Sequence, residues 1–361
     1  MTTLTSGAPK PQGSRSDPGW SVAVLRCGPF AVRWHRRSAG VALALLLLCC
    51  GVLLWSLTTG DLALGVHEVV AALTGRADGV TRTVVVTWRL PRAVAALVFG
   101  AGFAVAGAVF QSLTRNPLAS PDVIGFSSGA YTGALVVLTG VGGTYLDVAA
   151  GALVGGSATA VAVYLLAYRG GVQGFRLIVV GIAVSAMLTA ANTWMVLRAQ
   201  LDVAIAAAVW GAGSLNGVGW DRVAPACTVV LVLLVVLAGC QPTLRVMELG
   251  DDGARALGVR VERSRLLLLL IGVVLTAAVT AAAGPIAFVA LAAPHIARRL
   301  TRSPGVPLTA SALTGALLLA VADHAAHHLL PRALPVGVLT VVVGGAYLVW
   351  LLAREQRVRR R

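Results

Sequence analysis

The sequence predicts an all-α polytopic membrane protein with about ten transmembrane helices. Hydrophobic residues make up 57% of the 361-residue chain and charged residues only 12%, a composition typical of membrane proteins. Uncharged runs of about 20 residues, long enough to cross a bilayer core of roughly 30 Å, alternate with short charged segments. Arginine concentrates on alternate segments, so the net charge of +15 indicates membrane orientation rather than nucleic-acid binding.

The N-terminal segment 1–37 is polar and basic and lacks a signal-peptide cleavage pattern. We expect a disordered cytoplasmic tail there, followed by a ten-helix domain over residues 38–361. The expected spans are 38–60, 93–114, 120–142, about 147–168, about 175–197, about 223–241, the two arms of 266–297, about 305–322 and about 334–353. The third span is expected to begin with Ser120 as its N-cap and Pro121 in the first helical position.

The second expected span, 93–114, is rich in small residues, among them Gly100 and Gly107. Small side chains let helix backbones approach closely in lipid, so this span is expected to be a packed internal helix. It ends before Asn116-Pro117.

The uncharged run 266–297 carries arginines at both ends. At about 1.5 Å per residue it is too short for two complete crossings, although both arginine clusters are expected on the same side. Gly284-Pro285 is the only plausible turning point in the run. The sequence therefore predicts a tight hairpin with a short second arm.

The distribution of positive charge orients the chain. With ten spans, most of the 29 lysines and arginines fall on the side that holds both termini, which places both termini in the cytoplasm. Spans two to five and spans seven to ten would then run in opposite senses, which allows an inverted repeat. The sequence similarity between these two halves is weak.

The residues argue against an enzyme. The single lysine, Lys10, lies in the tail, so the chain has no GxxxxGK[ST] loop and cannot itself be a P-loop ATPase. There is no HExxH motif or credible serine or cysteine catalytic set, and the five cysteines lack a metal-binding spacing. Because nearly all carboxylates fall in loops, an ion-gradient-driven secondary transporter is an alternative with less support.

The charged connector around 248–258 predicts a two-turn helix. Asp251 or Asp252 would cap its start, Gly258 would end it, and Ala254 and Leu257 would share one face. Such a helix is too short to be stable alone, so it packs either on its own protein or on a partner.

Two further clusters lie near the outer side. Arg89 and Arg92 could reach lipid headgroups or bind carboxylates of an external partner. His324, His327 and His328 follow Asp323, but one weak cluster is more often not a metal site, and we expect no metal or cofactor.

Six segments in order resemble the permease subunits of the iron–siderophore and cobalamin uptake family of ABC importers, the FecCD type. They are RLPR (89–92), AGAVFQSLTRNPLASPDVIGFSSGA (106–130), WGAGSL (210–215), LGDDGARALGV (249–259), AGPIAFVALAAPHIARRL (283–300) and LPVGVLTVVVGGAYLVWLL (334–352). Each segment alone is weak, whereas the ordered set is highly specific and covers nearly everything after residue 85.

The resemblance implies a permease in the bacterial cytoplasmic membrane that pairs with a second copy or a paralogue. Two cytoplasmic ATPase subunits and an extracytoplasmic binding protein would complete the importer. The implied cargo is a metal chelate, foremost a ferric siderophore, with cobalamin or haem as alternatives.

The resemblance also implies roles for particular residues. Arg89 and Arg92 match arginines that meet glutamates of the binding protein, and Asn116 and Leu118 match the cytoplasmic constriction. The positions that match the ATPase-coupling helices, at about 245–260, are Glu248, Leu249, Gly250, Ala254, Leu257 and Gly258.

The sequence departs from the family pattern in two places. His327 stands where the family has a third docking arginine, and Arg332 follows five residues later. We therefore include both as docking residues and expect the contact there to be weaker, rearranged or pH-sensitive. In the loop before the fifth span, Gly174-Phe175 stands where relatives have small polar residues. This difference weakens the case for a gate in the loop before the fifth span.

Overall fold

The computed structural model describes residues 22–27, 30–141, 144–168, 174–303, 305–328 and 334–359. It is almost entirely helical. The elements are β1 (Val22–Cys27), β2 (Phe30–His35), α1 (Arg36–Thr58), α2 (Val66–Leu73), α3 (Gly79–Arg82), η1 (Thr83–Arg89), α4 (Leu90–Thr114), α5 (Phe126–Val136), η2 (Val137–Val141), α6 (Tyr145–Ala167), α7 (Gly174–Arg198), α8 (Leu201–Gly211), α9 (Trp220–Met247), α10 (Asp251–Ala256), α11 (Val261–Ala283), α12 (Val289–Thr301), α13 (Leu308–His328) and α14 (Val336–Arg359).

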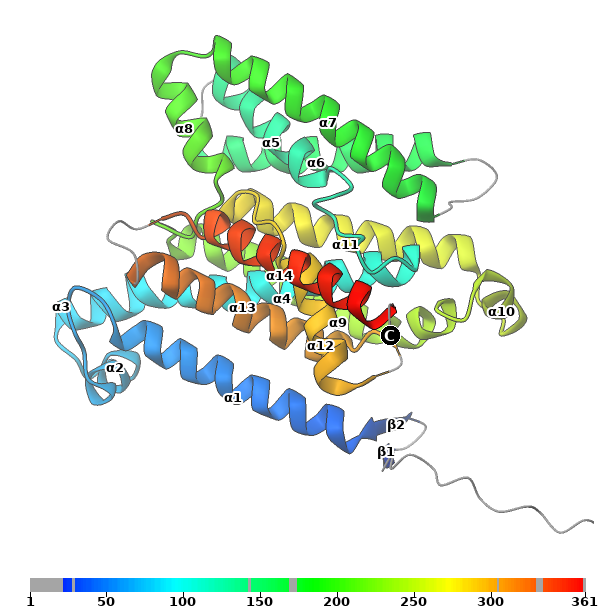
Figure 1. The fold of residues 1–361 in the computed structure, drawn as a ribbon. Coiled ribbons are helices and arrows are strands. Elements are labelled where there is room, and N and C mark those ends of the chain that lie inside the picture. The colour runs from blue at the N-terminus through cyan, green and yellow to red at the C-terminus, as the bar shows by residue number, and fades with distance from the viewer. Residues whose placement is uncertain are drawn as a thin grey trace, which may run out of the picture.

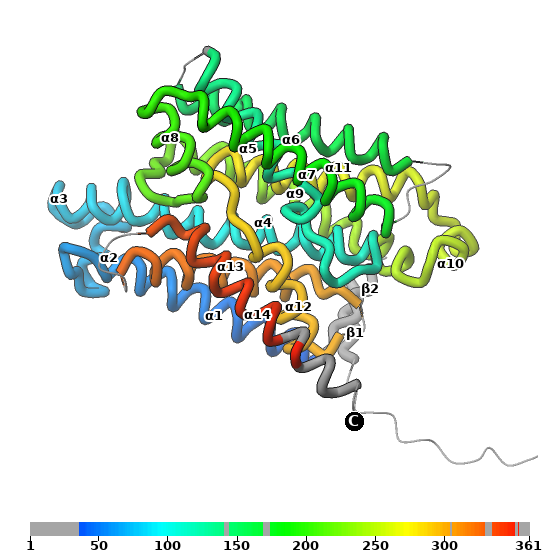
Figure 2. Tube along the Cα trace, turned by 45° about the horizontal axis from the view of Figure 1, so that its top comes forward, coloured from blue at the N-terminus to red at the C-terminus, as the bar shows by residue number. Residues whose placement is uncertain are grey.

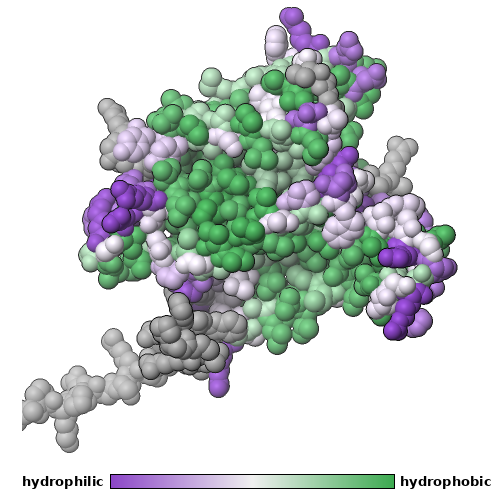
Figure 3. Space-filling view, turned by 180° about the vertical axis from the view of Figure 1, so that it is seen from behind, coloured by the Kyte–Doolittle hydropathy of each residue, from purple (hydrophilic) through white to green (hydrophobic). Residues whose placement is uncertain are grey.

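The long helices lie side by side in three adjoining groups (Figure 1; Figure 2). Helices α5 to α8 form one group, α4, α9 and α11 lie in the middle, and α1 and α12 to α14 form the third. The short helices α2 and α3 lie at one end of the bundle, called the α3 end below, and α10 marks the opposite, α10 end. Seen from behind, a broad hydrophobic surface separates hydrophilic patches at the two ends (Figure 3), as expected for a protein that crosses a bilayer.

Helix α4 is the central helix, as its small residues predict. The most hydrophobic stretches of α4 and α11 are each 78% buried, against 17% for α1 and 11% for α7. A Cβ atom at Gly100 would collide with the carbonyl oxygen of Gly315, and one at Gly107 with that of Ala290. The glycines therefore let α13 and α12 pack directly against the α4 backbone.

Each of the ten expected spans coincides with a helix. Seven helices of the described chain are long and apolar enough to cross a membrane by themselves, and the remaining three expected spans correspond to α5 with η2, α12 and α14. The division of the run 266–297 into two arms is confirmed, because α11 ends at Ala283 and α12 begins at Val289. The arms do not form a tight hairpin, since both pack on α4 rather than on each other. Gly284 has φ +74°, which permits the reversal between the two arms.

Three other sequence expectations need correction. Helix α5 begins at Phe126 rather than at Ser120, because residues 117–125 form turns and the Ser120 hydroxyl accepts the Val123 N–H at 3.4 Å inside them. The sequence between the fifth and sixth expected spans, in which we expect a loop, contains a further helix, α8. Within the expected tail, β1 and β2 pair as an antiparallel hairpin, whereas residues 1–21 lie outside the described part. The inverted repeat stays a prediction.

Candidate functional site

A cavity of about 630 Å³ opens at the α3 end of the bundle. The end of α1, η1, the start of α4, the loop before α9 and the last turn of α13 line it. Arg89, Arg92 and His327, which are three of the four residues predicted to dock a binding protein, all line this cavity. The fourth, Arg332, lies outside the described residues. The fold therefore brings together arginines and a histidine that are far apart in the sequence.

Both arginines of this cavity bind partners within the chain. Arg89 donates from Nη1 to the carbonyl oxygen of Leu57 at 2.8 Å and from Nη2 to that of Leu62 at 2.6 Å, which ties η1 to the loop after α1. Arg92 donates from Nε and Nη2 to the two carboxylate oxygens of Asp323 at 2.8 and 3.0 Å. These contacts hold the guanidinium groups in fixed directions, which the sequence pattern did not predict.

The Arg92–Asp323 pair is partly buried. Its side chains are 17% and 9% exposed, so the loss of one partner would leave the other charge poorly solvated. Three histidines of α13 lie beside it with their rings tilted against one another, with ring centroids 4.6 Å apart for His324 and His328 and 4.7 Å apart for His327 and His328. Across the described residues, no group of three or more histidines, cysteines and carboxylates is arranged to hold a metal ion.

The two predicted gate residues form one turn at the α10 end. Arg115 ends α4 with φ +50°, and Asn116 follows it. The Asn116 carboxamide oxygen accepts the N–H of Leu118 at 2.9 Å, and Leu118 is 42% exposed. His295 of α12 donates from Nε2 to the Pro117 carbonyl oxygen at 2.8 Å, so the turn is also attached to α12.

The expected helix of the charged connector is present as α10, with two differences. Its N-cap is Gly250, at φ +108°, rather than an aspartate, because the Asp251 carboxylate binds Arg265 instead of the helix N–H groups. Gly258 follows the helix with φ +82°, as predicted. Ala254 is fully buried while Leu257 is 62% exposed, so they do not share one face; Leu257 already lies beyond the end of α10.

The predicted coupling residues divide into an internal and an external set. The Glu248 carboxylate accepts the hydroxyl of Ser112 and the N–H of Val306, each at 3.2 Å, and thereby connects α9 to α4 and to the loop before α13. Leu249 is 71% exposed, and with Leu257 it presents a hydrophobic surface beside α10. We call Leu249 and Leu257 the α10 leucine pair.

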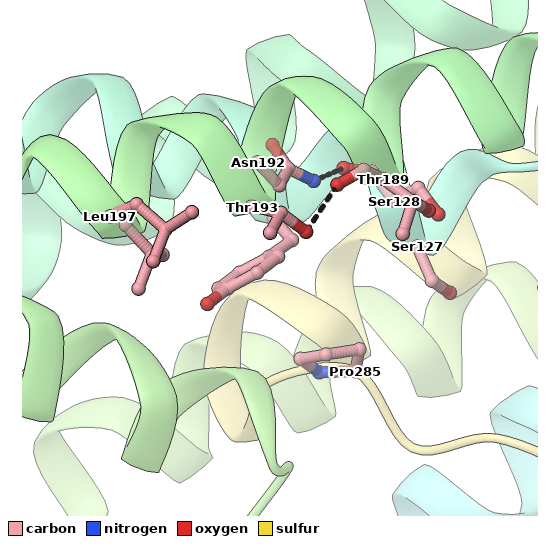
Figure 4. A pocket seen from close by; sticks show the side chains of 9 residues that line it. Ser127, Ser128, Thr189, Asn192, Thr193, Leu197 and Pro285 are labelled. Atoms are coloured by element: carbon pink, nitrogen blue, oxygen red, sulfur yellow. Dashed lines mark hydrogen bonds between the residues drawn. The ribbon is translucent and has the colours of Figure 1, made fainter.

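A polar groove that sequence reasoning missed runs between α5 and α7. Three shallow cavities of about 520, 380 and 490 Å³ follow one another along α7 and are called the α5–α7 groove. Polar residues that line it are Asp122, Ser127, Ser128, Thr139, Ser185, Thr189, Asn192, Thr193, Arg198 and Gln200. In the middle cavity, side chains of α5 and α7 face one another above Pro285 (Figure 4).

Hydrogen bonds hold the two walls of this groove together. Asn192 donates from Nδ2 to the Ser128 carbonyl oxygen at 3.2 Å and accepts the Thr132 hydroxyl at 2.7 Å. The hydroxyls of Ser128 and Ser185 are 3.0 Å apart. Thr189 and Thr193 remain exposed along the same side of α7.

A periodic signal in the sequence could have revealed the groove. Ser185, Thr189, Asn192 and Thr193 recur at spacings of three or four residues in an otherwise apolar span, which places them along one side of a helix. They were overlooked because a hydroxyl in a span can bond its own backbone, as Thr189 does to the Ser185 carbonyl at 2.7 Å.

Comparison with known proteins gives consistent matches over nearly the whole chain. The FecCD transport family matches residues 45–354. The ferric enterobactin transport system permease protein FepG of Escherichia coli (strain K12) is 50% identical over 323 residues, which cover 89% of this chain and 98% of that protein. The achromobactin transport system permease protein CbrC of Dickeya dadantii (strain 3937) is 37% identical, with coverage of 93% and 97%.

A solved structure agrees with these sequence matches. It is described as an inward-facing conformation of a metal-chelate type ABC transporter and superimposes with a TM-score of 0.76 at 25% identity. The match covers 88% of this chain and 99% of that one, so the similarity extends over the whole helical bundle rather than one segment.

Proposed function

The chain belongs to the FecCD transport family, and we propose that it forms one half of the passage through which an ABC importer carries a ferric siderophore into the cytoplasm. The observation that carries this proposal is the 50% identity to a ferric enterobactin permease across nearly the full length of both proteins. A second permease, two ATPase subunits and a binding protein would complete the transporter. The α3 end would face outward, and both termini and the α10 end would lie in the cytoplasm.

The α3-end cavity is the proposed docking site of the loaded binding protein. Arg89, Arg92, His327 and, outside the described residues, Arg332 would meet carboxylates on that protein. Since Arg92 already binds Asp323, an incoming carboxylate would either share the guanidinium or displace Asp323. Docking would thereby alter the contact between α4 and α13, which gives the binding protein a way to influence the bundle.

The α5–α7 groove is the proposed wall of the cargo path. Helix α7 is only 11% buried over its most hydrophobic stretch, so it is available to face a second permease across a central space. Exposed hydroxyls such as those of Thr189 and Thr193 can exchange weak hydrogen bonds with a polar chelate as it moves. A passage needs such contacts to be numerous and individually weak, so that cargo can leave as well as enter.

At the α10 end, the turn of Asn116 and Leu118 is the proposed gate and α10 the proposed contact with an ATPase subunit. The α10 leucine pair would enter a hydrophobic groove on that subunit, a common way for a short helix to bind. Glu248 and Ala254, by contrast, would act inside the permease by holding α10 in place.

Reconstitution in proteoliposomes tests this function. The permease, its ATPase and its binding protein are assembled with the second permease copy, and uptake of ⁵⁵Fe-labelled ferric enterobactin is followed with and without ATP. We expect uptake that requires ATP and all the subunits. Uptake driven by an ion gradient without the ATPase would contradict the proposal and support a secondary transporter.

The cargo is tested with the same vesicles. Unlabelled ferric enterobactin is expected to compete for uptake, whereas cobalamin and haem in equal amounts are not. Competition by cobalamin or haem would leave the importer function in place but would change the proposed substrate.

A further inference from the structure

Four charged side chains at the α10 end connect the proposed gate to the proposed ATPase contact. Arg115 at the end of α4 donates from Nη2 to Oδ1 of Asp251 in α10 at 2.6 Å. Arg265 of α11 donates from Nη2 to both carboxylate oxygens of Asp251, at 2.8 Å each, and from Nη1 to Glu262 at 3.3 Å. One aspartate therefore bridges three segments that are separate in the sequence.

The two arginines hold Asp251 in different ways. The Arg265 side chain is 8% exposed and donates to both carboxylate oxygens of Asp251, so it holds that carboxylate against α11. The Arg115 side chain is 51% exposed and makes a single contact. Exposed pairs contribute little to stability, whereas removing one partner of a buried pair is costly. The Arg265 contact is therefore structural, and the Arg115 contact can form or break without unfolding the bundle.

The backbone at Arg115 attaches this contact to the gate. Its φ of +50° is rarely adopted by residues other than glycine, and it marks the point at which α4 stops and the turn of Asn116 and Leu118 begins. A displacement of the Arg115 side chain acts on a backbone that is one residue from Asn116. On its other side the turn is attached to α12, through the His295 to Pro117 hydrogen bond.

We propose that the Arg115–Asp251 ion pair transmits the movement of α10 to the gate turn, with Arg115 as a positioning residue that links ATP hydrolysis to opening. This inference rests on the proposed function, because it assumes that an ATPase moves α10. A shift of α10 carries Asp251 with it and pulls or releases Arg115, so the two states of the gate differ by this contact. Thermodynamic coupling between two sites is reciprocal. The position of the gate turn therefore also changes the position of α10 and of the α10 leucine pair.

Arg115→Gln tests the link with little risk to the fold, because the Arg265–Asp251 anchor stays intact. The assembled transporter is reconstituted in proteoliposomes, and ⁵⁵Fe-labelled ferric enterobactin uptake and ATP hydrolysis are measured in the same sample. We expect uptake per ATP hydrolysed to fall about fivefold to tenfold, at the lower end of typical coupling between distant sites. Arg115→Lys keeps one charged donor and is expected to restore most of the ratio.

Arg302→Gln is the matched control. Arg302 also ends a helix, α12, with φ +50°, and it is an exposed arginine at the same end of the molecule. Among the described residues it forms no hydrogen bond or ion pair with α10. Its substitution is expected to leave uptake per ATP within about twofold of the wild type, as for a surface residue outside a network. In the double variant, Arg115→Gln with Asp251→Asn, uptake per ATP hydrolysed is expected to be no lower than in the more impaired of the two single variants, because both changes remove the same contact.

The outcomes separate the two proposals. If the wild type imports iron with ATP but Arg115→Gln keeps the wild-type ratio, the link is wrong and the importer stands. A fall in the ratio that Arg302→Gln reproduces, or that Arg115→Lys fails to rescue, would also overturn the link. If the wild type shows no ATP-dependent uptake, the proposed function fails and this inference fails with it.

Discussion

Both ends of the bundle hold their charged candidate residues in internal contacts, but the exposed side chains beside those contacts differ. At the α3 end, the predicted docking groups Arg89 and Arg92 already bind a pair of carbonyl oxygens and Asp323, so the polar groups expected to meet a partner are held by the protein itself. At the α10 end, the charged residues Glu248 and Asp251 also bind inward, but the hydrophobic Leu249 faces out. The α3-end cavity combines oriented charged groups with exposed apolar side chains such as Trp88. Beside α10, the exposed leucines lie next to charged groups that are paired within the chain.

This difference indicates two kinds of partner contact. Positive charges held in a fixed direction speed the association of an acidic surface and orient it. A complex formed mainly through such charges also dissociates readily. Buried leucines instead supply affinity through the removal of hydrophobic area from water. An importer needs transient docking of its binding protein and a lasting attachment of its ATPase, which matches the proposed use of the two ends.

The largest effect is expected from the α10 leucine pair. Burial of one leucine contributes about 1.5–3 kcal/mol, and a charge in its place opposes burial. Leu249→Asp together with Leu257→Asp should therefore weaken ATPase association at least tenfold and remove ATP-dependent uptake. Titration of the detergent-purified permease with the ATPase measures the loss.

Val80→Asp controls for the introduced charge. Val80 is 70% exposed on α3, at the opposite end of the bundle, so its replacement leaves ATPase association unchanged in this scheme. If the leucine double variant still binds the ATPase with wild-type affinity, the hydrophobic surface at the α10 end is not the contact.

A smaller effect is expected from the Arg92–Asp323 pair. Arg92→Ala leaves Asp323 poorly solvated and should destabilise the bundle by about 2 kcal/mol, below the value for a fully buried pair. It should also weaken docking of the binding protein. Thermal unfolding in detergent and binding-protein affinity measure the two effects separately.

The double variant Arg92→Ala, Asp323→Ala distinguishes stability from docking. It removes both charges, so most of the unfolding temperature should return while docking stays weak. Recovery of docking in the double variant would mean that Arg92 serves only to neutralise Asp323.

The features that could be predicted from the sequence depend on the local chain. The glycines of α4 predict close packing wherever the neighbours come from, and the length of the run 266–297 predicts the break at Gly284. Both arguments use only spacing and the thickness of a bilayer.

The features that could not be predicted depend on which segments meet. Arg92 and Asp323 are 231 residues apart in the sequence, and the Glu248 contacts join three separate elements. Position alone therefore identified candidate residues for docking and coupling but could not tell which of them face inward. For the α5–α7 groove, the spacing of Thr189 and Asn192 indicates a polar side of α7, but only the packing of α5 against α7 places Ser128 beside Asn192.

The groove predicts a moderate effect on transport. Thr189→Val with Thr193→Val removes two exposed hydroxyls with little change of shape, and each lost hydrogen bond to cargo is worth about 0.5–1.5 kcal/mol. The KM for ferric enterobactin should rise about threefold to tenfold. Thr228→Val is the control, because that exposed hydroxyl also bonds its own helix, at 2.8 Å, but lies on α9 away from the groove. Equal KM changes in both variants would exclude a specific role for the groove.

The smallest effect concerns acid sensitivity at the α10 end. Burial raises the pKa of Asp251, but the hydrogen bonds and charge of Arg265 and the charges of Arg115 and Arg255 more than offset this and lower the pKa below its usual value. A lowered folded-state pKa stabilises the protein above the unfolded pKa of about 3.9, and this contribution is lost as the pH falls through the folded-state value.

Asp251→Asn removes that contribution at every pH. The wild type should therefore unfold at a higher temperature than the variant from pH 5 to 8, and the gap should narrow only below about pH 4. Asp252→Asn provides the comparison, since that carboxylate is fully exposed and pairs only with Arg255 among the described contacts. A gap for Asp251→Asn that persists unchanged to pH 3 would mean that the carboxylate stabilises α10 through its shape and hydrogen bonds rather than through its charge.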